Sequence, residues 1–183
     1  MASDPIDPDL IFDGFNRDVL DSESSFEVLV RGYLWIDKVV SALIRAALPN
    51  ADALTPEALD WMRFEHKIQL AQAQGTLQYS TPMRALNKVR NQLAHNPHTQ
   101  IDASLVAELA RSFDELDADG NKVEWSLARL DDALPLIDRL RAIMNAIFVY
   151  SAACTISAFE LEDRLQPLRT DLLAALRSRS EEA

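Results

Sequence analysis

The chain has one cysteine, only four glycines and, over one long interval, no acidic residue. A single cysteine, Cys154, excludes an internal disulfide and is typical of a protein in a reducing compartment. We interpret it as a small buried apolar residue. Scarce glycine beside abundant Ala, Leu, Arg and Glu favours helices over sheets. The N-terminal residues MASDPIDPDL lack the apolar core of a signal peptide, so we expect a cytoplasmic protein.

The overall composition is that of an ordinary globular protein. Of 183 residues, 48% are hydrophobic and 26% are charged, and this length suffices for one domain with a sizeable core. The net charge of −11 and the pI of about 4.6 argue against a broadly basic surface that coats nucleic acid. The sequence contains no internal repeat and no inter-domain linker, so we expect a single domain.

The acid-free interval runs from His66 to Ile101. The chain's 29 acidic residues, spread evenly, would place roughly six of them in this interval. Its basic side chains include Arg84, Lys88 and Arg90, which makes the interval locally basic within an acidic protein.

Apolar residues recur at spacings of three and four over most of the chain, which indicates amphipathic helices. Thr-Pro pairs supply start signals, and Gly75 or Asn96-Pro97 supply stop signals. We expect helices over residues 22–48, 55–74, 82–94, 103–113, 135–162 and 165–176.

The N-terminal residues 1–20 are rich in Asp and Pro, with isolated apolar residues. We expect an arm without regular structure that is pinned onto the body by Ile11, Phe12 and Phe15. The alternative is a strap across a partner chain. At the other end, residues 177–183 are expected to form a disordered tail.

Two stretches invite special interpretations. The run DELDADGNK resembles a calcium loop, but with Gly120 at the sixth position the twelfth residue would be Ser126, so we interpret Asp119-Gly120 as a turn. Residues 123–125 after it suit either a short strand or the entry to a helix. The 18 uncharged residues 142–159 match the length of a membrane span, but their polar members favour a central helix, partly buried against a second subunit.

The stretch that suggests chemistry is LNKVRNQLAHNP, from Leu86 to Pro97. On an ideal helix, Arg90 and His95 lie about 140° apart and about 7.5 Å apart along the axis. They do not share one face, but both could reach one cleft where the helix ends, most easily a cleft completed by another chain.

These residue types suit reactions at a phosphodiester. A guanidinium grips phosphate oxygens, and an imidazole exchanges protons near neutral pH. We therefore predict catalytic roles for Arg90, Asn91 and His95, substrate binding by Arg84 and Lys88, and no cofactor. Such a pair also arises by chance, and helix-terminal histidines often only cap carbonyls. A metal site of His95, His98 and a distant carboxylate is a further alternative, while His66 is interpreted as a surface residue.

The segment Arg90-Asn91-Gln92-Leu93-Ala94-His95 resembles the signature of the HEPN superfamily, an Arg followed by a polar residue and, after four intervening residues, a His. The preceding KIQLAQAQGTL is similar to the corresponding part of families related to the mannitol operon repressor. The resemblance covers about residues 22–115.

The resemblance implies an all-α, up-and-down helical bundle over residues 21–176, here with additional C-terminal helices. It implies a homodimer with two motifs at a shared cleft, and a metal-independent endoribonuclease of a toxin–antitoxin or phage-defence system. An antitoxin or a nucleotidyltransferase is the implied partner. Because the uncharged stretch 142–159 contains several polar residues, we expect no association with a membrane. The alternative is a non-catalytic dimer that acts as a regulator or scaffold, as in mannitol-repressor-like relatives.

Overall fold

The computed structural model describes residues 8–48, 50, 54–96, 98–114 and 133–181. In this part of the chain every regular element is a helix and none is a strand, so the all-α prediction is confirmed. The elements are α1 (Pro8–Phe15), a π-helical turn (Asn16–Leu20), α2 (Ser25–Ala46), α3 (Pro56–Trp61), α4 (Phe64–Ala73), α5 (Thr81–His95), α6 (Ala103–Arg111) and α7 (Leu136–Glu181).

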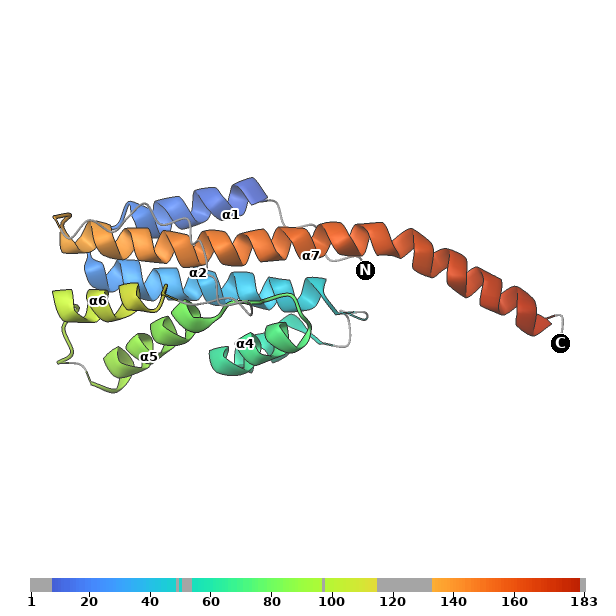
Figure 1. Cartoon of the computed structure of the whole chain (residues 1–183), viewed down its shortest axis with the longest axis horizontal. Helices are drawn as coiled ribbons and strands as arrows, with labels where there is room; N and C mark the ends of the chain where they lie inside the picture. The colour runs from blue at the N-terminus through green and yellow to red at the C-terminus, as the bar shows by residue number, and fades with distance from the viewer. Residues whose placement is uncertain (1–7, 49, 51–53, 97, 115–132, 182–183) are drawn as a thin grey trace.

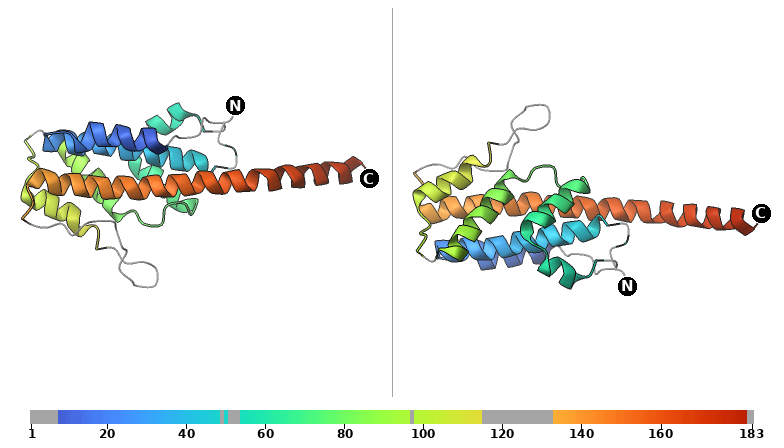
Figure 2. Two further views of the ribbon diagram at one scale, coloured as in Figure 1. Left: turned by 90° about the horizontal axis from the view of Figure 1, so that it is seen from above. Right: turned by 90° about the horizontal axis from the view of Figure 1, so that it is seen from below.

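The long helices α2 and α7 lie side by side and form the axis of the molecule (Figure 1). Seen from below, α4, α5 and α6 cross one face of this pair, while α1 lies on another side (Figure 2). α2 buries the apolar stripe that its periodicity predicts, since Leu29, Ile36, Val40 and Leu43 are fully buried. The expected helix over 22–48 is therefore confirmed, with Ser24 accepting the N-cap hydrogen bond from the Glu27 amide.

From Pro8 to Leu20 the N-terminal segment is helical, which corrects the expected lack of regular structure over these residues. Phe15 is fully buried and stacks on Phe148 of α7 with ring centroids 3.8 Å apart, and Phe12 meets the same ring edge-on at 5.4 Å. The predicted pinning by apolar residues is thus confirmed. A helix places both side chains on the face that contacts the Phe148 ring. The sequence did not predict this helix, because Asp and Pro have low helix propensity.

The predicted helix over 55–74 is broken into α3 and α4 by extended backbone at Met62 and Arg63. The Thr55 cap and the positive φ of Gly75 are as expected. Leu59 and Phe64 are both buried, yet residues five apart lie about 140° apart on one continuous helix. The break turns both side chains to the core.

α7 is longer than expected. The helix predicted over 165–176 is not a separate element, since α7 continues to Glu181 across most of the segment 177–183 that we expected to be disordered. It projects well beyond the other helices (Figure 1). Its stretch Leu136–Leu161 is long and apolar enough to cross a membrane by length and composition, and 44% of that window is buried within the structure. The buried side packs on α2, as in the core helix of a bundle.

Several sequence interpretations fall outside the described residues: the turn at Asp119-Gly120, the calcium-loop comparison and the undecided residues 123–125.

Gly14 lies where α1 passes Trp35 of α2. A Cβ atom there would lie 2.6 and 2.7 Å from two carbons of the indole ring. The ring cannot easily move, because its N–H donates to Asp18 over 3.2 Å and its edge meets Phe148.

We expect Gly14→Ala to lower the free energy of unfolding by about 1–2 kcal/mol, since overpacking a fixed ring outweighs the helix propensity gained. Urea unfolding followed by circular dichroism measures it. Gly32→Ala is the control, because a Cβ there meets the flexible Met144 side chain, and its cost should be smaller. A Gly14 variant as stable as the wild type would contradict the expectation.

Candidate functional site

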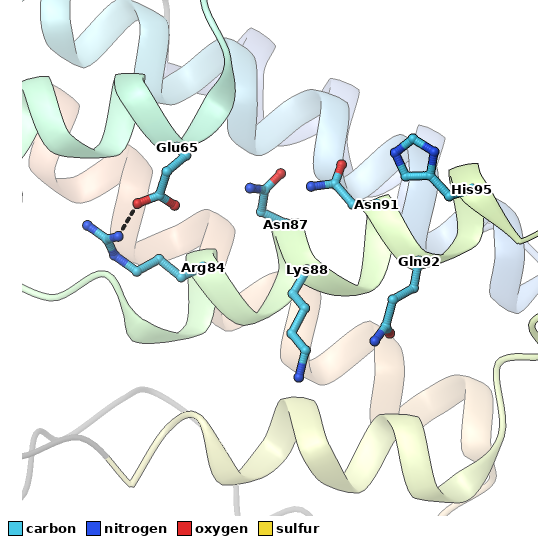
Figure 3. Close-up of a pocket in the computed structure, with 7 residues that line it drawn as sticks. All are labelled: Glu65, Arg84, Asn87, Lys88, Asn91, Gln92 and His95. Carbon is cyan, nitrogen blue, oxygen red and sulfur yellow. Dashed lines mark hydrogen bonds and ion pairs between the residues drawn. The ribbon is translucent and has the colours of Figure 1, made fainter.

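One face of α5 carries the candidate site. The opposite face holds α5 against the body through Met83, Leu86 and Val89. The outward face forms a shallow hollow of about 530 Å³ together with Glu65 of α4 (Figure 3). Its lining residues on α5 recur at helical spacing and are Arg84, Asn87, Lys88, Asn91, Gln92 and His95. We call this hollow the α5 groove.

Arg84 lies in the groove, and each nitrogen of its guanidinium has a partner in the protein. It forms an ion pair with Glu65 (Figure 3), donates from Nη2 to the Gln72 side chain over 3.0 Å and from Nε to Ser80 Oγ over 3.1 Å. These contacts join the start of α5 to α4. These contacts give Arg84 a supporting role in the structure, and the substrate binding suggested by the sequence stays a prediction.

Lys88 also lies in the groove and is paired. Its ammonium lies 2.7 Å from Glu108 Oε1 of α6. The acid-free interval of the sequence is thus bounded in space by carboxylates from just outside it, Glu65 on one side and Glu108 on the other. The local positive charge that the sequence suggests is largely compensated.

Arg90 does not line the groove. Its guanidinium lies over the Tyr33 ring of α2, 5.3 Å from the centroid, and donates from Nη1 to Asn91 Oδ1 over 3.1 Å. Such a cation–π contact holds the cation against the body without neutralising it. Within the described residues, Arg90 has no carboxylate within ion-pair distance, so its positive charge at the surface is not compensated by an anion.

His95 is the last residue of α5, and its exposed imidazole faces the groove beside Asn91 (Figure 3). The helix keeps regular geometry to its end, so the expected divergence of Arg90 and His95 onto different faces is confirmed. Asn91 lies between them: it lines the groove with His95 and accepts the hydrogen bond from Arg90. His66 is exposed, as expected.

Tyr33 supports the site from α2. It lies beneath Arg90, packs edge-on against Phe64 of α4 with centroids 5.1 Å apart, and donates its hydroxyl to Asn87 Oδ1 of the groove over 3.4 Å. Burial and, to a smaller extent, the Asp37 carboxylate raise the pKa of the hydroxyl to about 12, while the Arg90 cation opposes the rise.

This pKa predicts a loss of stability at high pH. The unfolded chain releases the Tyr33 proton near its ordinary pKa of about 10, whereas the folded chain keeps it to about pH 12. Between these values the unfolded state binds fewer protons, so the free energy of unfolding falls as pH rises. Tyr33→Phe should make that decline shallower in urea unfolding at successive pH values. An unchanged slope would show that Tyr33 does not titrate in this window.

Four further residues of the site lie outside the predicted set. Two of them, Asn87 and Gln92, could have been predicted, because helical spacing places them on the same face as Lys88 and His95. Tyr33 and Glu108 come from distant helices, and no local pattern marks them.

Within the described residues, no group of three or more His, Cys, Asp and Glu side chains is placed to hold a metal ion. No protein-family model, curated protein or solved structure matches the chain.

Proposed function

We propose that this protein is an endoribonuclease of the HEPN type, an all-α domain that cleaves RNA without a metal ion and works as a homodimer. The observation that carries the proposal is the arrangement around Asn91. Asn91 contacts the charged Arg90 on one side and shares the α5 groove with His95 on the other.

In the proposed reaction, Arg90 binds the non-bridging phosphate oxygens and stabilises the charge that develops on them. His95 accepts the proton of the ribose 2′-hydroxyl or donates one to the leaving 5′-oxygen. The 2′-oxygen bonds to phosphorus as the bond to the 5′-oxygen breaks, which leaves a cyclic phosphate. Asn91 orients the Arg90 guanidinium through the hydrogen bond of 3.1 Å.

Because Arg90 and His95 leave α5 in different directions, one copy presents them poorly to a single phosphate. A second copy would supply the opposing groups across a shared cleft. Within each copy, Asn87 and Gln92 offer amide contacts along the groove, and Lys88 can contact RNA once it leaves Glu108.

The biological setting that we propose is a cytoplasmic toxin–antitoxin or phage-defence system. An antitoxin or a nucleotidyltransferase would restrain the nuclease.

The test is incubation of the purified protein with total RNA in EDTA. Cleavage by the wild type that is lost in His95→Ala and in Arg90→Ala supports the proposal. Absence of cleavage by the wild type, or equal cleavage by the variants, contradicts it.

The second candidate function is a non-catalytic dimer that regulates or scaffolds. It is favoured by two large apolar side chains exposed on α2, Phe26 and Leu34, which are 57% and 58% exposed and suit a protein partner. Expression would then be harmless to a cell, whereas a nuclease should arrest growth. A stable dimer in solution without RNA cleavage would favour this function.

A further inference from the structure

We propose that Glu108 regulates the α5 groove by competing with RNA phosphate for Lys88. In the free protein the carboxylate holds the ammonium, and an incoming phosphate takes its place. This inference rests on the proposed function, because it takes RNA as the ligand of the groove.

In the Lys88–Glu108 ion pair, a ligand anion can replace the carboxylate at little cost. Lys88 Nζ lies 2.7 Å from Glu108 Oε1, and the two side chains are 61% and 45% exposed. Ion pairs this exposed contribute little to stability, so replacing one anion by another costs little. The Lys88 ammonium also holds the pKa of the Glu108 carboxyl below its usual value, so the competing charge is present throughout the neutral range.

The other cation of the groove differs in this respect. The Arg84 guanidinium has partners at three of its atoms, in Glu65, Gln72 and Ser80. Releasing it would break all three contacts. Lys88, with one carboxylate partner, is therefore the cation of the groove that a ligand can recruit.

Glu108 is held in place by its own helix. Asp102 caps α6 by accepting from the Leu105 amide over 2.9 Å, and Val106 and Leu109 bury its inner face. Arg111, three positions after Glu108, also favours the ionised carboxylate. When phosphate takes Lys88, the charge of Arg111 still favours the ionised Glu108 carboxylate, which reduces the electrostatic cost of the exchange.

The experiment measures binding of a short fluorescein-labelled oligouridylate to His95→Ala protein, which removes cleavage from the assay. Adding Glu108→Gln should free Lys88 for one more phosphate contact. At 0.1 M salt this should tighten binding by about fivefold and steepen the slope of log affinity against log salt by about 0.7. Glu160→Gln on α7 is the matched control, because it removes the same charge at an exposed position outside the groove.

The effect must also depend on Lys88. With Lys88→Gln in the background, Glu108→Gln should no longer change the affinity. The proposal is overturned if Glu108→Gln has no more effect than Glu160→Gln, if its effect persists without Lys88, or if the oligouridylate binds none of the variants. If Glu108→Gln binds more tightly but the wild type does not cleave RNA, the competition at Lys88 is supported and only the proposed nuclease activity is contradicted.

Discussion

His95→Ala is expected to lower the rate of RNA cleavage in EDTA by at least about a hundredfold, because a positioned general acid or base contributes about 10²–10⁴. The imidazole is exposed in the α5 groove, so its removal should leave the fold intact. Single-turnover cleavage of labelled RNA measures the rate, with circular dichroism as the check on folding.

His98→Ala is the matched control, since it removes an exposed histidine beyond the end of α5 and outside the groove. It should cleave at the wild-type rate. If both histidine variants lose activity equally, or neither does, His95 has no special role.

Arg90 provides an independent arm of the same experiment. Arg90→Ala should cost about 10²–10³ in rate by removing the group that stabilises the phosphate charge. Arg90→Lys keeps the charge but loses the planar pair of donors, so we expect an intermediate rate. Full activity in Arg90→Ala would exclude Arg90 from the reaction.

The second large effect concerns stability. Asp37→Ala should lower the free energy of unfolding by about 2–3 kcal/mol, because it leaves the Lys67 ammonium without its carboxylate in the core. Lys67 is 1% exposed, and its Nζ lies 2.8 Å from both carboxylate oxygens of Asp37. Asp37 itself is 27% exposed, which keeps the cost below that of a fully buried pair.

Urea unfolding of four proteins tests this: the wild type, Asp37→Ala, Lys67→Met and the double variant. The double variant should recover most of the loss, since no unpaired charge remains. Glu27→Gln breaks the exposed pair with Arg31 but keeps an amide oxygen that can accept from the Ser22 hydroxyl, so it should change stability by less than about 0.5 kcal/mol. A double variant as unstable as Asp37→Ala would show that the loss comes from another contact.

The elements whose signals are local could be predicted from the sequence alone. α2, α5 and α6 begin and end within a few residues of the predicted bounds, because apolar spacing, Pro82 and the Asp102 cap act within one or two helical turns. The divergence of Arg90 and His95 follows in the same way, since the angle between two positions of a helix depends only on their separation.

Other elements depend on contacts between residues far apart in the chain, and these contacts override the local sequence pattern. α1 coils because Phe12 and Phe15 must both reach Phe148. The helix break before Phe64 lets that ring and Leu59 share one core. Phe148, and the Tyr33 ring that packs on Phe64, lie far from these residues in the sequence, so no local periodicity could place the contacts.

The charge of the site shows the same division. The acid-free interval is a property of the sequence, and it predicts free cations on α5. Folding brings Glu65 and Glu108 against Arg84 and Lys88, and the Tyr33 ring beneath Arg90. The charges of Arg84 and Lys88 are thus compensated by carboxylates, whereas the charge of Arg90 is not. Pairing depends on the distance between charges in space and not on their separation along the chain.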